Sequence, residues 1–213
     1  MARMKRPRDY IGDLCSSPNS ETRRLGETLR GQYSHWTQSL SLEELTTFLK
    51  TIQEKKEKIG APQLFGKFRA YSFEEFVYRL IQARILIPKN MGVYWGEKCL
   101  IWKEENQEYG MELDILIGKK LNEFVEARVA VDAKVELDAA RLKTTLASFL
   151  LLREWNSQVK CFLVYMREEI NPVLLDLAKP WIDGTCQLTP ERDETESFIK
   201  SFQDAINRSQ MRA

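Results

Sequence analysis

Histidine is nearly absent from the sequence, and its scarcity excludes several kinds of site. His35 is the single histidine among 213 residues, so a motif that needs two histidine ligands, such as H-E-x-x-H, is excluded. A Ser-His-Asp arrangement would depend on His35 alone, and no G-x-S-x-G motif accompanies it. Any chemistry must therefore come from carboxylates and lysines, with or without a metal ion.

Cysteine pairs and long apolar segments are also missing. The four cysteines, Cys15, Cys99, Cys161 and Cys186, are scattered with no C-x-x-C pair, which predicts buried reduced thiols rather than a disulfide framework or a zinc site. No apolar run approaches the about 20 residues that cross a bilayer, and the basic start lacks the apolar stretch of a secretion signal. We therefore expect a cytoplasmic protein that does not bind membranes.

Neither sign of charge dominates, because the formal net charge is only +1. The distribution is uneven: residues 1–70 carry 13 Lys and Arg against 8 Asp and Glu, whereas residues 71–213 carry 19 against 23. A basic N-terminal part on a mildly acidic remainder is compatible with a polyanionic partner. Solvated surface charge explains the same distribution equally well.

The first part of the chain is expected to be helical. Residues 1–19 are basic and then rich in small polar residues, and we expect their start to be poorly ordered. Residues 20–59 have the spacing of a helical hairpin, whose second helix begins at a capping box of Ser41 and Glu44. A further amphipathic helix is predicted to begin at an N-cap, Ser72.

The remainder alternates between strand-like and helical patterns, which predicts an α/β fold with a mixed central sheet flanked by helices. We divide the chain into an N-terminal helical region (1–68), a core (69–190) and a C-terminal helix packed on the core (191–213). The expected strands are 93–95 and 99–103, joined around Gly96, then 111–117, 124–135 and 159–165. The expected helices are 72–85, 137–155, 171–179 and 191–208. Three tryptophans, Trp95, Trp102 and Trp155, are expected in the core.

Two of these strands place charged side chains on one patch of the sheet. Side chains of a strand alternate between its faces, so Asp114 lies opposite the apolar face of the run Leu113–Ile117. Asp132 and Lys134 likewise share the face that points away from Val131 and its apolar neighbours. If the strands pair, two carboxylates and one ammonium converge. The alternative is an ion pair on an exposed sheet face, worth at most about 1 kcal/mol.

This arrangement resembles the PD-(D/E)XK nuclease superfamily, which includes many restriction endonucleases. The matching residues are Asp114 in Glu-Leu-Asp, then Asp132-Ala-Lys134 starting 18 residues later, with Glu74 on the helix before the sheet. The resemblance covers about residues 70–167. The sequence departs from the pattern at Leu113, where the family's name has proline, and in using Asp132 where Glu is more frequent.

The resemblance implies a restriction endonuclease-like fold and a magnesium site, in which manganese would substitute. Carboxylate and carbonyl oxygens suit these hard cations, so Asp114 and Asp132 are the expected ligands, with the Ala133 carbonyl as a third. Lys134 would orient or deprotonate the attacking water, or stabilise the charged transition state. By resemblance Glu74 completes the metal site, although a first-turn carboxylate favoured by the helix dipole is an equal alternative. Whether Glu74 or Glu75 reaches the site is left open.

The resemblance further implies a DNA endonuclease of the type II restriction kind, or another defence or repair nuclease, acting on double-stranded DNA. Cutting both strands of a symmetric duplex would call for a homodimer. Two alternatives stay open. One is a non-catalytic nucleic-acid-binding or assembly subunit that keeps the fold, and the other is a junction resolvase or an RNA-directed nuclease.

Overall fold

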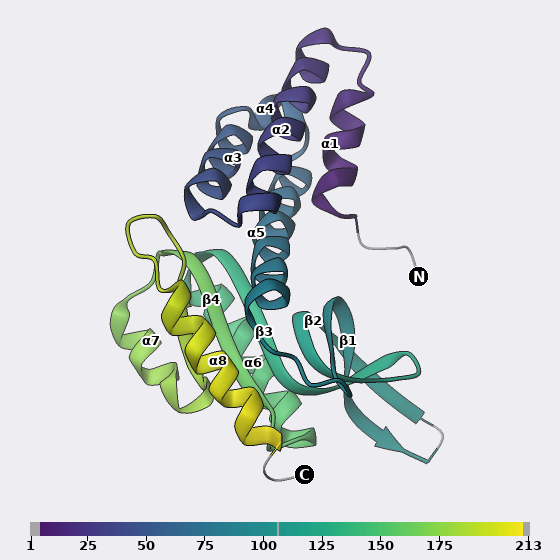
Figure 1. The fold of residues 1–213 in the computed structure, drawn as a ribbon, viewed down its shortest axis with the longest axis vertical. Helices are drawn as coiled ribbons and strands as arrows, with labels where there is room; N and C mark the ends of the chain where they lie inside the picture. The colour runs from purple at the N-terminus through teal and green to yellow at the C-terminus, as the bar shows by residue number, and fades with distance from the viewer. Residues whose placement is uncertain (1–4, 106, 211–213) are drawn as a thin grey trace.

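The structure is a computed structural model that describes residues 5–105 and 107–210. A group of helices is stacked on one end of a sheet, and a long helix, α5 (Pro62–Arg84), joins the two parts (Figure 1). The helices before it are α1 (Pro7–Cys15), α2 (Ser20–Ser39), α3 (Leu42–Glu54) and α4 (Lys56–Ile59).

One expectation for the helical part is wrong, and another lies outside the described residues. Residues 1–4, the start for which poor order was expected, are not described, whereas residues 7–15 form α1, because Pro7 presets the first helical turn and Tyr10, Ile11 and Leu14 are buried. Ser72 does not begin a helix, because α5 already starts at Pro62 and the Ser72 hydroxyl donates to the Phe68 carbonyl 2.7 Å away. The capping of α3 is as expected, since the Ser41 side chain accepts the Glu44 N–H.

The sheet has the order β1-β2-β3-β4-β5 in the described chain. The first three strands are antiparallel neighbours, and β4 and β5 add in parallel to β3. Their bounds are β1 (Gly92–Glu104), β2 (Gln107–Leu121), β3 (Phe124–Leu137), β4 (Lys160–Glu168) and β5 (Gly184–Gln187). The remaining helices are α6 (Ala139–Trp155), α7 (Pro172–Ala178), the short 3-10 helix η1 (Lys179–Trp181) and α8 (Thr195–Gln210).

The strand boundaries correct the sequence-based expectation at three points. Residues 93–103 form one continuous strand rather than a hairpin, because Gly96 takes a left-handed conformation (φ 64°) without ending the ladder. Strand β2 does not end at residue 117 as expected, since Lys119 and Lys120 still pair with β3, and the turn between the two strands lies at Asn122 (φ 53°). Strand β5 is short and only half-buried, and its sequence did not indicate a strand.

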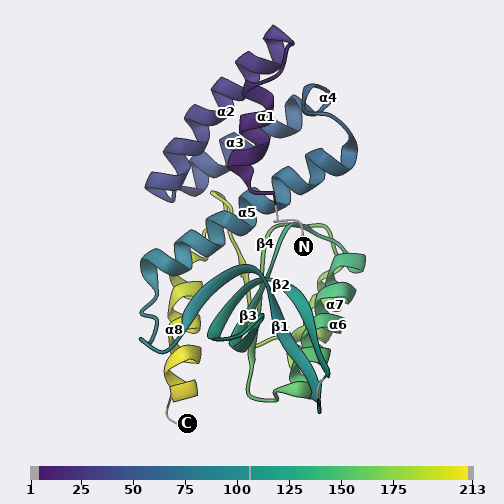
Figure 2. The same ribbon diagram turned by 90° about the vertical axis from the view of Figure 1, so that its right-hand side faces the viewer.

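Helices cover both faces of the sheet, so the expected mixed sheet flanked by helices is confirmed. One face, which carries Ile115 and Val131, packs against α5 and α8, and the buried side chains of the N-terminal helices extend the same core beyond α5. The other face, which carries Leu116 and Ala130, packs against α6 and α7. Figure 2 shows α8 on one side of the sheet and α6 with α7 on the other. Helix α5 continues unbroken across residue 68, the expected boundary, so one helix belongs both to the N-terminal helical region and to the core.

The burial of individual residues answers three smaller expectations. Cys99, Cys161 and Cys186 are buried free thiols, as expected, and Cys15 is partly exposed. Trp95 is in the core, but the prediction is wrong for Trp102 and Trp155, which are 39% and 40% exposed because they lie at the outer ends of β1 and α6. Within the described residues no helix is long and apolar enough to cross a membrane.

Candidate active site

The candidate site lies where the sheet divides. The β2–β3 ladder has its last pair at Ile115 and Val131, whereas β2 continues beside β1 and β3 continues beside β4. The next residues along the two strands are Asp114 and Asp132, which would face each other in the same register. The Asp114 carboxylate instead accepts the backbone N–H of Ala133 at 2.8 Å, so a side chain takes over where the backbone pairing stops.

Lys134 joins the two carboxylates. Its ammonium donates to Asp114 Oδ2 at 3.1 Å and forms a short ion pair with Asp132 Oδ1. The other oxygen of Asp132 accepts a short hydrogen bond from the hydroxyl of Thr145 on α6. Asp132 is only 6% exposed. The structure therefore brings together three of the residues predicted from sequence, and it adds Thr145 as the group that orients Asp132.

The site holds more negative than positive charge. The Asp114 and Asp132 carboxylates both bind the Lys134 ammonium, so their negative charges lie close together. Burial, and then the charges of Asp132 and Glu74, raise the pKa of Asp114 well above its usual value. Burial also acts to raise the pKa of Asp132, but Lys134 and the hydrogen bonds outweigh it, so the pKa of Asp132 is lowered. The pair thus accepts one negative charge readily and resists the second, which favours a proton or a cation between them.

Glu74 approaches this cluster from α5, and its neighbour Glu75 does not. Glu74 is 6% exposed and its Oε2 accepts the indole N–H of Trp95 at 3.0 Å. Burial raises the pKa of Glu74 to about 7, with Lys134 and Asp132 acting on it electrostatically. Glu75 points to the helical region, where it accepts the Tyr33 hydroxyl at 2.8 Å and pairs with Arg79. Of the two glutamates, Glu74 is the one that faces the site.

Sequence reasoning missed two of the side chains that hold this site. Thr145 is a polar residue inside the buried stripe of α6, between Leu142 and Phe149, and that misplaced polarity was a signal for it. Trp95 was expected only to pack in the core, and no pattern in the sequence pairs it with Glu74.

The donor set fits a hard divalent cation, although incompletely. Two adjacent carboxylates with excess negative charge have the oxygen chemistry that Mg²⁺ or Mn²⁺ prefers. In the described chain, however, no three or more His, Cys, Asp or Glu side chains are grouped as a ready metal site. Glu74 is bonded to Trp95, and the Lys134 ammonium lies where the Asp114 and Asp132 carboxylates converge.

The mixed sheet, its order and the helices on both faces define a restriction endonuclease-like fold. The chain is similar to a solved structure of BbvCI, a type II restriction endonuclease, described as its native A2B2 tetramer at low resolution. The TM-score is 0.55 at 13% sequence identity, and the match covers 94% of this chain and 93% of that chain. No protein-family model matches the sequence, and a search of curated proteins finds no match.

The extent of this likeness changes one expectation. From sequence the resemblance was confined to about residues 70–167, but 94% coverage leaves too few residues outside to exclude the N-terminal helices. The helices before α5 therefore belong to the shared fold rather than forming an unrelated appendage.

Proposed function

We propose that this protein is a metal-dependent DNA endonuclease that hydrolyses phosphodiester bonds, of a restriction or other defence type. The observation that carries the proposal is the cluster at the division of the sheet, where Asp114 and Asp132 both bind Lys134. Two carboxylates share one ammonium, so negative charge is in excess and favours a bound cation. The fold, which is restriction endonuclease-like, agrees with the proposal.

The residues have distinct roles in this proposal. Asp114 and Asp132 hold the metal, with the Ala133 carbonyl as a further ligand. A bound Mg²⁺ or Mn²⁺ would neutralise the charge that develops on the phosphoryl oxygens, and it would lower the pKa of a bound water. Lys134, which already donates to both carboxylates, orients the attacking water or stabilises the developing negative charge. Glu74, held by Trp95, completes the acidic surroundings of the metal.

The substrate we propose is double-stranded DNA, cut by a homodimer so that each copy acts on one strand. An exposed apolar surface on α6, α7 and η1 supports a second copy of the chain as its occupant. Helices α6 and α7 lie together in Figure 2 and both contact η1, and exposed apolar side chains on neighbouring elements are typical of interfaces. The large apolar side chains of this surface are each at least 40% exposed, namely Leu150, Leu151, Trp155, Val173, Leu174, Leu177 and Trp181.

The oligomeric state can be tested independently of the chemistry. We expect sedimentation equilibrium to give a dimer for the wild type and a monomer for Leu151→Glu combined with Leu177→Glu. Leu86→Glu is the matched control, because Leu86 is 82% exposed at a site outside this surface. A wild type that stays monomeric at micromolar concentration, or a dimer that survives the double substitution, would contradict the homodimer.

The test of the nuclease is cleavage of supercoiled plasmid with Mg²⁺, with Mn²⁺ and with a chelator. We expect the wild type to cut with either metal, and Asp132→Ala and Lys134→Ala to leave the plasmid intact. Asp204→Asn, an exposed acid on α8, is the control and is expected to cut like the wild type. If the wild type and both site variants leave the plasmid equally intact with each metal, the proposal is wrong.

A non-catalytic nucleic-acid-binding or assembly subunit is the second candidate. The geometry that favours it is the ion pairing of Lys134 with both carboxylates, together with the lack of a three-acid group among the described residues. Calorimetric titration with Mn²⁺ separates the two. Binding that is lost in Asp132→Ala supports the nuclease, whereas DNA binding without any metal binding supports the subunit.

A further inference from the structure

Arg6 lies beside the candidate active site, and its guanidinium group has no polar partner there. The guanidinium carbon lies 4.8 Å from the centre of the Trp95 ring, whose N–H donates to Glu74 at 3.0 Å. Within the described residues the Arg6 side chain makes no ion pair and no hydrogen bond. Asp9, the nearest acid in the sequence, instead accepts the Arg6 backbone N–H at 2.8 Å. All five N–H donors of the guanidinium are therefore free.

The donors of Arg6 are also accessible. Some buried polar atoms of the described chain have neither a partner nor contact with solvent, Arg69 Nε among them, but none of these atoms belongs to Arg6. The Arg6 side chain is partly exposed, so its N–H groups can reach a ligand. Stacking on the Trp95 ring holds the planar guanidinium in one orientation. A guanidinium held in this way is preorganised to donate two parallel hydrogen bonds to an oxyanion.

Tyr71 adds a second free donor next to Glu74. It precedes Glu74 by three residues on α5, so the two side chains lie on the same face of the helix. The Tyr71 hydroxyl has no hydrogen-bond partner in the part of the chain that the structure describes, and it is not among the atoms closed off from solvent. Burial raises the pKa of Tyr71, and nearby carboxylates, Glu74 first among them, raise it further. The hydroxyl therefore keeps its proton and can donate it in a hydrogen bond.

Tyr10 connects these two donors. The centres of the Tyr10 and Tyr71 rings are 6.4 Å apart, and the Tyr10 backbone N–H donates to the Arg6 carbonyl at 3.4 Å, one turn earlier. The contacts close into a ring of five side chains from the start of α1, from α5 and from β1, namely Arg6, Trp95, Glu74, Tyr71 and Tyr10. The free donors of Arg6 and Tyr71 therefore border the same stretch of surface beside Glu74.

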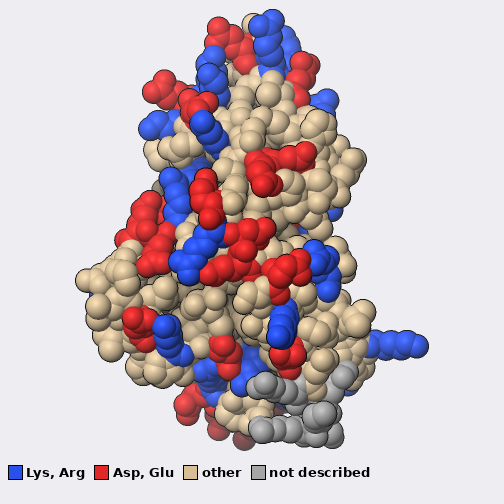
Figure 3. Space-filling model, turned by 60° about the vertical axis from the view of Figure 1, so that its left-hand side comes forward, with Lys and Arg blue, Asp and Glu red and all other residues tan. Residues whose placement is uncertain are grey.

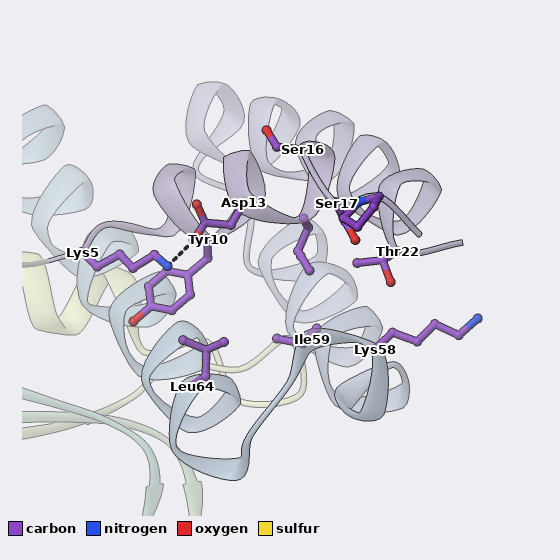
Figure 4. Close-up of a pocket in the computed structure, with 11 residues that line it drawn as sticks. Lys5, Tyr10, Asp13, Ser16, Ser17, Thr22, Lys58, Ile59 and Leu64 are labelled. Carbon is purple, nitrogen blue, oxygen red and sulfur yellow. Dashed lines mark hydrogen bonds and ion pairs between the residues drawn. The ribbon is translucent and has the colours of Figure 1, made fainter. Parts of the chain in front are cut away.

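Cations near Arg6 do not offer the same donors. Lys5 lies 4.6 Å from the centre of the Tyr10 ring but is paired with Asp13. Figure 4 shows the Lys5 side chain directed at Asp13, beside a cavity of about 450 Å³ in the N-terminal helices. Figure 3 shows Lys and Arg side chains beside Asp and Glu side chains at the waist of the molecule, as in paired surface charge. Arg6 differs from such cations because a ring, and not a carboxylate, holds it in place.

A phosphate that approaches the candidate site meets an excess of negative charge. Lys134 lies within the cluster but already binds the Asp114 and Asp132 carboxylates. Like charges at close range repel each other more strongly where little water separates them. A nucleic-acid strand therefore gains from a further cation beside the metal site, and the Arg6 guanidinium is a cation in this position with free donors.

We propose that Arg6 and Tyr71 bind a backbone phosphate of the nucleic acid, next to the phosphate that is cut. This inference rests on the proposed function for the identity of the ligand. The Arg6 guanidinium supplies the charge and two parallel N–H donors, and the Tyr71 hydroxyl donates a further hydrogen bond. Trp95 contacts both Arg6 and Glu74, so one buried side chain fixes the position of the bound phosphate relative to the acidic cluster.

The experiment measures the affinity for a duplex oligonucleotide by fluorescence anisotropy at several salt concentrations, with Ca²⁺ in place of Mg²⁺. We expect Arg6→Gln to weaken binding about 5- to 10-fold and to reduce the salt slope by about 1, because one phosphate contact is lost. Arg6→Lys keeps the charge but not the planar pair of donors, so it should weaken binding about 2- to 3-fold with an unchanged slope. Tyr71→Phe removes one neutral donor and should also weaken binding about 2- to 3-fold with an unchanged slope.

Arg30→Gln is the matched control. Arg30 is an exposed arginine of α2 that likewise has no ion pair in the described chain, so this change removes the same charge elsewhere and should alter affinity by less than about 2-fold. If Arg30→Gln and Arg6→Gln weaken binding equally, the duplex responds to net charge and the phosphate contact is refuted. A lower free energy of unfolding in Arg6→Gln, with affinity and salt slope unchanged, would show that Arg6 only packs on Trp95, which also refutes the contact.

The outcomes separate this proposal from the nuclease. Weaker binding and a smaller salt slope in Arg6→Gln, in a protein that never cuts plasmid, uphold the phosphate contact and refute the nuclease. Cutting by the wild type, with an Arg6→Gln variant that binds duplex as the wild type does, refutes the phosphate contact alone. A wild type that binds no duplex also refutes the contact.

Discussion

Strand β3 carries two charged clusters of opposite imbalance within a few residues. At the division of the sheet, Asp114 and Asp132 share Lys134, so negative charge is in excess. Two residues further along the strand, Arg69 and Arg167 share Glu136, so positive charge is in excess. The first arrangement favours a bound cation, whereas in the second the two guanidinium groups hold Glu136 between α5 and β4.

Burying charges that do not balance costs stability, and the chain does so at both places. At Asp114 and Asp132 the imbalance coincides with the proposed metal site, where binding a cation is worth more than stability. The predictions that follow test the carboxylate side first, because its expected effects are larger.

Replacing Asp114 should separate activity from stability most clearly. We expect Asp114→Asn to lower plasmid cleavage by roughly a hundred- to a thousandfold or more, because a metal ligand is lost. The same change leaves one carboxylate for one ammonium, so the free energy of unfolding should rise by about 1 kcal/mol. Urea denaturation at pH 7 measures it. A variant that cuts normally, or that is less stable than the wild type, would contradict the assignment of Asp114.

The pH dependence of the free energy of unfolding should show how much the buried Glu74 carboxylate destabilises the fold. Its pKa is raised in the folded protein from 4.5 to about 7 by burial, so its unfolded state loses the proton first. Stability is then full below pH 4.5 and falls as pH rises toward 7. Glu74→Gln lacks this loss and keeps an acceptor for Trp95, so at pH 8 it should be more stable by roughly 2 to 3 kcal/mol.

The measurement is urea denaturation of wild type and Glu74→Gln from pH 4 to pH 8. The difference between them should be near zero at pH 4 and grow to its full value above pH 7. Glu75→Gln is the contrast on the same helix, and it should lower stability, because Tyr33 and Arg79 lose their carboxylate partner. A Glu74→Gln gain that does not change with pH would rule out burial of an ionised Glu74 as its cause.

Local sequence patterns predicted the cluster at Lys134 but not the cluster at Glu136. Alternation along a strand was enough to place Asp114, Asp132 and Lys134 on one patch, because side-chain direction repeats every second residue. Glu136 continues the same alternation, but its partners come from α5 and β4, and tertiary packing alone brings them together. The division of the sheet was equally hidden, since it depends on where the β2–β3 ladder ends.

Helix and strand boundaries failed for a similar reason. Ser72 had the sequence of an N-cap, yet it is fully buried in mid-helix, because α5 is fixed by packing against both the helical region and the sheet. Gly96 had the sequence of a turn, yet β1 continues through it beside β2. In both cases neighbours distant in sequence override a local signal, so only the elements whose local and tertiary preferences agree were predicted well.

On the cationic side, Glu136 is expected to matter for stability. Burial acts to raise its pKa, but Arg69 and Arg167 outweigh it, so the pKa of Glu136 is lowered. Its contribution is therefore present above pH 4.5 and is lost as pH falls through the folded pKa. Glu136→Ala should lower the free energy of unfolding at pH 7 by about 2 kcal/mol, less than for a fully buried pair because Arg167 is 56% exposed.

Denaturation of Glu136→Ala at pH 7 and at pH 3 provides the check, with Glu136→Gln as the variant that keeps an acceptor oxygen. The loss should shrink at low pH, and Glu136→Gln should lose less than Glu136→Ala. A Glu136→Ala variant as stable as the wild type at pH 7 would mean that Glu136 does not stabilise the fold and that other contacts hold Arg69 and Arg167.

The smallest effect is expected at the Asp183 cluster, which has the same charge ratio as the Glu136 cluster. Lys160 pairs with Asp183 at 2.9 Å, yet its side chain is 41% exposed, and Asp183 keeps Arg153 and the Cys161 N–H. Lys160→Gln should therefore lower the free energy of unfolding by about 0.5 kcal/mol or less in urea denaturation at pH 7. A loss as large as that of Glu136→Ala would mean that solvent exposure does not weaken the Lys160–Asp183 ion pair.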